Sequence, residues 1–508
     1  MITWLSTMVR AGWGRFPPLG PFGRNVMTLA GGTVVAQAVM AVFLPVLARL
    51  YSAEEFGICA VFTSVGTIAA VIASGRYDLS IPIPASDSEA WALFRLATWL
   101  AAGFALGSGL LLWLWIPALL APLGSLAHLL PLYIACTAYS TAAGYWLGRE
   151  GDFSWVSLSR IIQAVAILGL QVVWSCLGYS GGLVIGLVSG AALLSLLNLA
   201  RIRWGRSGVH SRFSLTQAAR GHYRSPCFLL PAHAVNTLGA QLPVVFMNSF
   251  FGAAMAGFFG LALRLVGLPL QVISQSVNQV FFPHASREYA ARGECAALFT
   301  RLVKRLFCIG AVGLGLALLC GPLLVEVVMG EQWRTAGRII QILAPFLLIR
   351  FVSSAVGSMS MIAGRQDVDL KWQVFMLVLV LAGLSVGAVF DDWRLSVVGY
   401  GIGSAVAFSA ALVICYRFAR YGSGRSCADE RPAAARPAEQ ENGDVVASEA
   451  NRKAGASGTD AAGNAKCPAP AVVPFPPPPH VAVVDRRPAA VPERHRRHHG
   501  LGTPEARP

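Results

Sequence analysis

Long apolar runs dominate the hydropathy pattern of this 508-residue chain. Twelve stretches of about 20 mainly apolar residues are long enough to cross a bilayer core as α-helices. They fall near residues 25–48, 56–75, 92–117, 121–147, 157–177, 180–200, 226–249, 256–280, 303–328, 338–362, 372–390 and 395–416. The pattern predicts an all-α membrane protein with about twelve transmembrane helices.

The connections between these spans differ in charge. Those that follow odd-numbered spans are short and carry only Arg49, Arg334, Arg338 and Arg394, whereas those that follow even-numbered spans are rich in arginine. Basic loops are retained in the cytoplasm. Both termini are therefore expected to be cytoplasmic, with the first span directing insertion in place of a cleaved signal.

Composition supports the membrane class. The chain is 55% hydrophobic and only 13% charged, and its mean hydropathy is +0.59, whereas soluble domains are about 25% charged. A net charge of +15 would suggest nucleic acid in a soluble protein, but in membrane proteins the basic excess collects in cytoplasmic segments. No nucleic-acid partner is expected. Ten cysteines without metal-ligand spacing predict no metal, disulfide or cofactor.

The pattern divides the chain into five segments. They are a cytoplasmic N-terminal segment (1–24), an N-lobe with spans one to six (25–200), a basic cytoplasmic linker (201–225), a C-lobe with spans seven to twelve (226–420) and a tail (421–508). The tail is rich in Ala, Pro, Gly and Arg and cannot bury enough apolar surface to fold, so it is predicted to be a disordered cytoplasmic segment. The alternative is that the Arg/His cluster of this tail contacts anionic lipid headgroups.

The two halves of the chain resemble each other at a spacing of about 200 residues. Arg24 aligns with Arg224 and Gly57 aligns with Gly257, each within similar local sequence, and two further matches follow in the same order. Each half holds an even number of spans, so the repeats share one orientation. This arrangement predicts two parallel six-helix lobes with a substrate site between them near the bilayer midplane.

The eighth span contains polar residues that a lipid-facing helix would exclude. In "LALRLVGLPLQVISQSVNQVFFP" (261–283), a helical repeat of 100° places Arg264, Gln271, Gln275 and Asn278 on one face. A central arginine costs roughly 2.5 to 3.5 kcal/mol on insertion, so its charge must face a partner or a water-filled cavity. Glu326 is the main candidate partner. Arg350 in span ten likewise needs a partner or a water-filled cavity.

Guanidinium groups bind phosphates in fork geometry, and amides hydrogen-bond to sugar hydroxyls. The residues predicted to line a substrate pathway are Arg264, Arg350, Gln271, Gln275, Asn278, Asn236, Gln37 and Arg49. For the amides, hydrogen bonding between helices is an equal alternative, and Arg49 can instead snorkel to the interface. Arg76, Tyr77 and Asp78 are candidates for an inner gate or an interfacial anchor.

Several segments together resemble a known family. They are "FLPVLARLYSAEEFG", "SGRYDLSI", "LALRLVGLPL", "QSVNQVFFP" and "GEQWRTAGRIIQILAPFLL". They are similar to the polysaccharide transport family, which contains flippases for O-antigen and exopolysaccharide repeat units. That family belongs to the multidrug/oligosaccharidyl-lipid/polysaccharide exporter superfamily. The likeness extends from Asn25 to Tyr416 and omits the tail.

The resemblance implies twelve helices in two lobes around a central cavity, in a bacterial inner-membrane protein that is not an enzyme. It implies an undecaprenyl-pyrophosphate-linked oligosaccharide as substrate, moved from the cytoplasmic to the periplasmic leaflet by alternating access. Membrane lipids, a polysaccharide polymerase and chain-length machinery are the further partners it suggests. Span one contains no acidic residue where drug antiporters often carry an ion-coupling carboxylate, which leaves the coupling ion open.

Other functions remain as alternatives. A multidrug antiporter and a peptidoglycan-precursor lipid flippase are the nearest, although the spans contain few of the acidic residues that an antiporter needs. A polytopic glycan polymerase is less favoured, because the chain has no HExxH or P-loop motif and only short predicted periplasmic connections. A scaffold for glycan assembly is the third class.

Overall fold

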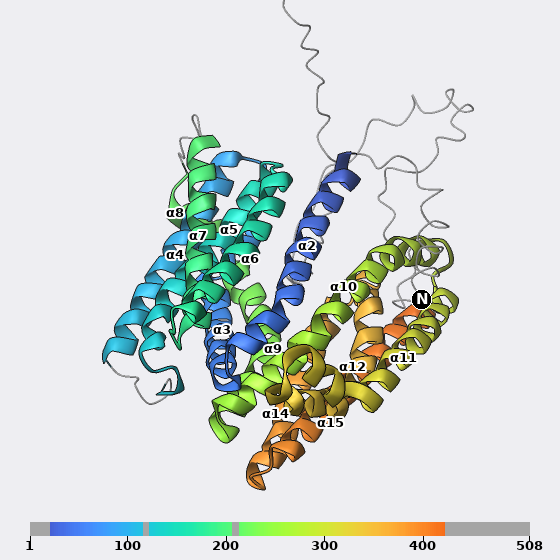
Figure 1. Cartoon of the computed structure of the whole chain (residues 1–508). Coiled ribbons are helices and arrows are strands. Elements are labelled where there is room, and N and C mark those ends of the chain that lie inside the picture. The colour runs from blue at the N-terminus through green and yellow to red at the C-terminus, as the bar shows by residue number, and fades with distance from the viewer. Residues whose placement is uncertain (1–20, 115–120, 206–212, 422–508) are drawn as a thin grey trace, which may run out of the picture. The chain divides into compact units, whose positions relative to one another are not determined.

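The computed structural model describes residues 21–114, 121–205 and 213–421, which are almost entirely helical and contain no strand. Their long helices are α2 (Pro21–Leu50), α3 (Ala53–Ala73), α4 (Asp87–Leu114), α5 (Leu130–Arg149), α6 (Phe153–Cys176), α7 (Gly182–Gly205), α9 (Leu230–Phe251), α10 (Ala253–Arg292), α11 (Ala296–Met329), α12 (Arg334–Val356), α14 (Gln366–Val389) and α15 (Trp393–Tyr421) (Figure 1). Short helical turns lie between them: η1 (Tyr77–Ser80), η2 (Ala121–Leu129), α8 (Leu215–Gly221), η3 (Ser225–Leu229), η4 (Glu331–Trp333) and α13 (Met359–Ile362). Most of the predicted N-terminal segment and nearly all of the predicted tail lie outside the described residues.

The twelve predicted spans correspond to these twelve helices, with differences at several ends. Helix α10 continues to Arg292, well beyond the predicted end at residue 280. The fourth predicted span begins as the 3-10 turn η2, and α5 starts only at Leu130. Eleven of the described helices are long and apolar enough to cross a membrane. Helix α9 is not among them, because it carries His233, Asn236, Gln241 and Asn248.

Local sequence explains the tight connections at one end of the bundle. Ser52 caps α3, and the Glu55 carboxylate accepts a hydrogen bond from the Ser52 backbone N–H, so the chain reverses direction within two residues. The corresponding link between α9 and α10 is Gly252 alone. Its φ of +85° lies in the left-handed region that favours glycine. Helices α3 and α10 therefore both begin at this end.

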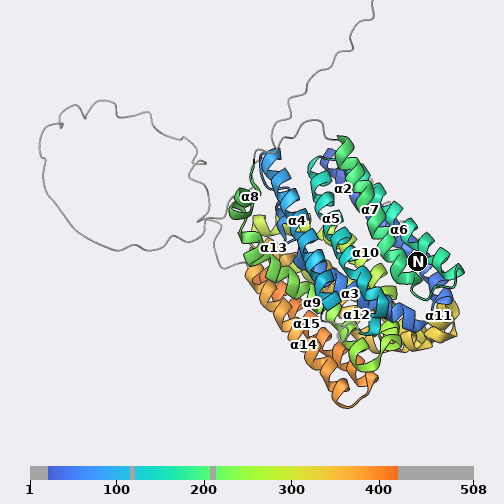
Figure 2. The same cartoon turned by 90° about the vertical axis from the view of Figure 1, so that its left-hand side faces the viewer.

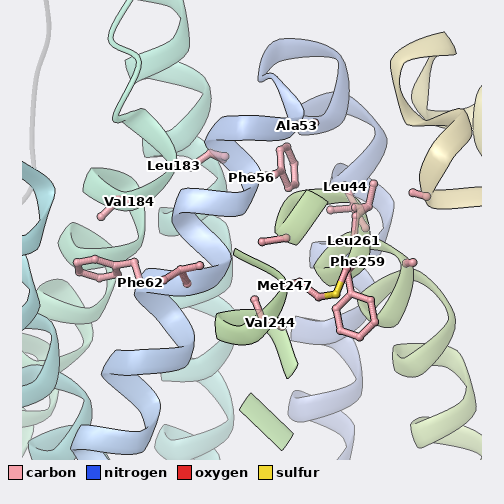
Figure 3. Packing of buried hydrophobic residues seen from close by; sticks show 14 of the residues in the cluster. Leu44, Ala53, Phe56, Phe62, Leu183, Val184, Val244, Met247, Phe259 and Leu261 are labelled. Atoms are coloured by element: carbon pink, nitrogen blue, oxygen red, sulfur yellow. The ribbon is translucent and has the colours of Figure 1, made fainter. Parts of the chain in front are cut away.

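One hydrophobic core joins the two halves of the helical unit. We call α2 to α7 the N-lobe and α9 to α15 the C-lobe. Buried side chains from both lobes belong to a single cluster, which includes Phe56 and Phe62 of α3, Met247 of α9 and Phe259 of α10 (Figure 3). Helix α3 packs against both α9 and α10. Within the N-lobe, α7 lies between α5 and α6 (Figure 2).

The closest contact between the lobes is a crossing of α3 and α10 at two glycines. A Cβ atom added at Gly57 would overlap the carbonyl oxygen of Ala253, and one added at Gly257 would overlap the carbonyl oxygen of Ala53. The contact is reciprocal, and both pairs differ by 200 in residue number. This reciprocity agrees with the internal repeat predicted from the sequence. Only glycine allows the two backbones to approach this closely.

Hydrogen bonds to helix ends hold the lobes together beside this crossing. The last carbonyls of a helix have no partner within it, and that of Ala48 in α2 accepts hydrogen bonds from Trp333 Nε1 and Gln332 Nε2, each at 2.7 Å. The Trp333 ring is fully buried and packs edge-on against Phe56, with centroids 4.9 Å apart. We call this contact region between the lobes, with the glycine crossing, the closed end.

A buried tyrosine supports the same region from within the N-lobe. Tyr51 joins α2 to α3, and its hydroxyl donates a hydrogen bond to the Gln171 carbonyl oxygen at 2.5 Å. Burial, together with the negative charge of Glu55, raises the pKa of Tyr51 to about 12. The phenol therefore remains a proton donor throughout the physiological pH range.

Alanine at either glycine of the crossing is expected to destabilise the protein. Replacing Gly57 or Gly257 by Ala forces the backbones apart, an overpacking that costs about 1 to 3 kcal/mol. The melting temperature of the detergent-purified protein should therefore fall. Gly103→Ala in α4 is the control, because a Cβ atom there meets nothing within 4 Å. Melting temperatures unchanged in both crossing variants would contradict the close contact.

Candidate functional site

A cavity of about 700 Å³ lies between the lobes. Its walls come from α2, α3, α6 and α7 of the N-lobe and from α9, α10 and α12 of the C-lobe. It begins beside the closed end at Leu47 and Phe56 and continues along α10 as far as Gln271. We call it the central cavity. Its volume is within the range of about 300 to 1,000 Å³ that is usual for ligand sites.

Three arginines line the central cavity: Arg160 of α6, Arg264 of α10 and Arg350 of α12. None of the three forms an ion pair with another described residue. Arg160 donates a hydrogen bond to the Thr33 hydroxyl of α2 at 2.6 Å, so one guanidinium bridges two cavity walls. A charge within a membrane span must face a partner or water. The central cavity supplies that environment for all three.

Glu326, the carboxylate considered as a partner for Arg264, is engaged elsewhere. Its carboxylate lies 3.5 Å from Arg334 Nε, toward the end of α11. No acidic residue is found among those lining the central cavity. Arg264 therefore presents an uncompensated positive charge to the cavity.

The polar residues of α10 share one continuous hollow surface. Arg264 and Gln271 line the central cavity, and Gln271, Gln275 and Asn278 line a second cavity of about 570 Å³ between α10 and α12. Arg350 and Gln271 belong to both. We call the second one the C-lobe cavity. The four residues predicted to share a helical face thus do so, despite Pro269 between them.

The other predicted pathway residues have different positions. Gln37 of α2 lines the central cavity, whereas Asn236 is exposed on α9 and lines none of the cavities described here. Asn278 donates hydrogen bonds to Ala355 O and Ser358 Oγ, each at 3.1 Å. For Asn278 the helix-to-helix alternative therefore applies, although its side chain also borders the C-lobe cavity.

Arg49 lies at the closed end and lines neither the central cavity nor the C-lobe cavity. Its guanidinium donates to the carbonyl oxygens of Val327 and Val328, at 3.4 and 3.3 Å. These are among the last carbonyls of α11, which lack partners within the helix. Arg49 thus links α2 of the N-lobe to α11 of the C-lobe, and the structure assigns it to the lobe contact.

The residues considered as an inner gate form a second link between the lobes. Arg76 has a left-handed backbone, with φ of 59°, and its Nη1 lies 3.4 Å from the buried carboxylate of Asp78. Its Nη2 lies 2.8 Å from Nδ1 of His233 in α9. Ser74 donates a further hydrogen bond to Asp78. The cluster ties the end of α3 to the start of α9, at the opposite end of α3 from the glycine crossing.

Arg160 is the cavity residue that sequence reasoning missed. It lies near the start of the predicted fifth span, where an arginine is typical of the membrane interface. The available signal was Gln163, three residues later on the same helical face. Both residues also line a third cavity, of about 610 Å³, which lies within the N-lobe between α5, α6 and α7. We call it the N-lobe cavity.

Sequence comparison identifies the family. A family described as "Polysaccharide biosynthesis protein" matches residues 46–337, which is more than half of the chain. A teichuronic acid biosynthesis protein, TuaB of Bacillus subtilis, is 29% identical over 36% of this chain and 38% of its own length. The succinoglycan biosynthesis transport protein ExoT of Rhizobium meliloti is 26% identical over 66% of this chain and 64% of its own. The matched parts therefore span less than two thirds of these relatives.

Structural comparison shows the fold. An inward-facing multidrug resistance MATE transporter of the MOP superfamily aligns with a TM-score of 0.59 and 16% identity, over 77% of this chain and 93% of that one. The lipid II flippase MurJ, in an inward closed conformation, aligns with a TM-score of 0.61 and 13% identity, over 76% and 86%. Both neighbours have two lobes of six helices. The chain is a multi-pass membrane protein with this two-lobed transporter fold, and it belongs to the polysaccharide biosynthesis protein family.

Proposed function

We propose that the protein is a flippase that moves an undecaprenyl-pyrophosphate-linked oligosaccharide from the cytoplasmic to the periplasmic leaflet of the bacterial inner membrane. The observation that carries this proposal is the convergence of Arg160, Arg264 and Arg350 on one cavity without a carboxylate partner among the described residues. Such a set is suited to a ligand with several negative oxygens in one small group.

The diphosphate meets this requirement. Guanidinium groups form paired, charge-assisted hydrogen bonds with phosphate oxygens. Their summed positive potential in a low-dielectric cavity would also concentrate an anionic headgroup. The polyprenyl chain can remain in the surrounding lipid while only the headgroup enters. The names of the relatives, which include polysaccharide biosynthesis and transport, fit this cargo.

The charge of the helix ends supports one orientation of the protein in the membrane. The closed end carries few basic residues, whereas the ends of α10 and α11 away from it carry Arg287, Arg292, Arg301, Lys304 and Arg305. Basic segments remain in the cytoplasm, so the closed end faces the periplasm and both termini are cytoplasmic. The closed end then separates the central cavity from the periplasm, and the contact of Arg76 with His233 lies toward the cytoplasmic side.

Two rival functions fit less well. A cationic drug would be repelled by three arginines, and no Asp or Glu is among the residues that line the three cavities. A polymerase needs an extracytoplasmic domain, but the described links at the closed end are as short as 51–52, 252 and 330–333. A peptidoglycan-precursor flippase shares the same chemistry. It is distinguished by whether deletion of the gene is lethal.

Loss of a cavity arginine is expected to block glycan export. Arg264→Ala, Arg350→Ala and Arg160→Ala each remove charge-assisted hydrogen bonds worth about 1.5 to 3 kcal/mol. Each should therefore reduce export roughly tenfold or more, and lysine should restore it only in part. The measurement is surface polysaccharide in a deletion strain complemented with each variant, together with the amount of lipid-linked repeat units in the cytoplasmic leaflet.

The matched control for these variants is Arg95→Ala. Arg95 is an exposed arginine in α4 that lines none of the three cavities. Glycan export by the Arg95→Ala variant should equal that of the wild type. Immunoblots of membranes should show equal amounts of every variant. Near-normal export by all three cavity variants would refute the proposed role of these arginines.

Alternating access predicts that the closed end can be opened by mutation. Cys59 lines the central cavity two residues beyond Gly57, so in a protein with Cys59 as its sole cysteine, an impermeant maleimide should label it from only one side of the membrane. Combining Trp333→Phe with Gln332→Ala removes both hydrogen bonds to Ala48. Labelling should then occur from both sides.

The control for this labelling is Trp372→Phe. Trp372 Nε1 donates to the Ala407 carbonyl at 2.7 Å, which is an equivalent bond made within the C-lobe. Its loss should leave the labelling one-sided. The closed end would not be the barrier if the Trp333/Gln332 variant remained one-sided as well.

A further inference from the structure

We infer that the N-lobe cavity receives the sugar part of the cargo while its diphosphate is held in the central cavity. This inference rests on the proposed function and assigns a second subsite to it. Binding of the diphosphate by the three arginines does not itself involve the N-lobe cavity. Its own shape and lining point to a sugar.

The cavity lies where α5 and α6 have only a small contact with each other. Both helices pack on α7 (Figure 2), and the cavity lies between them. Gly144 and Gly148 of α5 line it and present no side chain to it. A Cβ atom at Gly144 would meet nothing within 4 Å. At about 610 Å³ the cavity is nearly as large as the central one.

The lining is rich in hydroxyl, amide and aromatic groups. The lining residues that carry such groups are Thr137, Ser140, Thr141, Tyr145, Ser159, Gln163, Asn198, Tyr133 and Phe153. No carboxylate is among the lining residues, and Arg149 is already bound to Asp87 at 3.0 Å. Hydroxyls and amides pair with sugar hydroxyls, and aromatic faces cover the apolar face of a sugar ring. The cavity thus suits a neutral or acidic sugar and not a cation.

Two lining side chains have hydrogen-bonding capacity to spare. The Tyr145 hydroxyl and the Gln163 amide make no hydrogen bond to any described residue, although both are half-buried within the helical bundle. Unpaired polar groups inside a membrane protein cost free energy unless water or a ligand meets them. A hydroxyl-rich ligand would satisfy both at once.

The two cavities meet on one face of α6. Arg160 and Gln163, three residues apart, line both of them. A phosphate held by Arg160 would therefore leave its attached sugar next to Gln163, at the mouth of the N-lobe cavity.

The test is to fill the N-lobe cavity. In Gly144→Phe the new ring should occupy the space of the sugar. Binding is measured with purified protein in nanodiscs and two probes: undecaprenyl diphosphate, and the undecaprenyl-diphosphate-linked repeat unit isolated from the deletion strain. We expect the wild type to bind the repeat-unit lipid at least tenfold more tightly. Gly144→Phe should abolish that preference while binding undecaprenyl diphosphate normally.

Two comparisons guard against simple misfolding. Gly103→Phe introduces the same ring at a glycine that lies outside the three cavities and has no neighbour within 4 Å of an added Cβ atom. This variant should bind both lipids as the wild type does. Tyr145→Phe, which preserves shape, should weaken binding of the repeat-unit lipid alone, by about threefold to tenfold. Arg264→Ala should weaken both lipids.

The outcomes separate the inference from the proposed function. If the wild type binds neither lipid, the flippase proposal itself fails and the sugar subsite fails with it. If both lipids bind equally well, or if Gly144→Phe retains the preference for the repeat unit, only the sugar subsite is overturned. Loss of the preference in Gly144→Phe, with intact binding of undecaprenyl diphosphate, supports it.

Discussion

The structure depends on the cost of placing unpaired charge in a membrane. Arg160, Arg264 and Arg350 lie within predicted spans and have no carboxylate partner among the described residues. Lipid cannot solvate a guanidinium group, so a hollow that admits water must surround each one. The lobes must therefore separate along part of their length. A protein with these arginines and a fully packed interior would pay several kcal/mol for each ion.

The closed end is built from a different kind of contact. Beside the buried apolar side chains that join the lobes, it uses backbone groups: the peptides at Gly57 and Gly257 are in close contact, and the carbonyls of Ala48, Val327 and Val328 accept hydrogen bonds. Each such hydrogen bond contributes about 0.5 to 1.5 kcal/mol net. A contact of this strength excludes solvent, yet binding of a charged headgroup can offset its loss. A two-state transporter needs this balance between its conformations.

Much of the architecture was predictable from hydrophobic runs, because membrane spans are long and the helical period is fixed. The alignment of Arg264, Gln271, Gln275 and Asn278 on α10 was predictable for the same reason. The partners of a polar face were not, since periodicity does not identify the neighbouring helix. Asn278 bonds to α12, Glu326 pairs with Arg334, and Arg49 binds α11. Arg160 was missed because its position also fits an interfacial anchor.

The reciprocal crossing of α3 and α10 is the arrangement found where two identical subunits meet on a two-fold axis. In a true homodimer every residue near that axis appears twice, so an arginine at position 264 would have a second, repelling copy close by. Here the two halves belong to one chain, so corresponding positions can carry different residues. At the spacing of 200 that relates Gly57 to Gly257, Arg264 corresponds to Ser64. The Ser64 side chain is uncharged and donates a hydrogen bond to Gln241. A single chain thus permits an asymmetric cavity, with different chemistry on its two walls, inside a nearly symmetric frame.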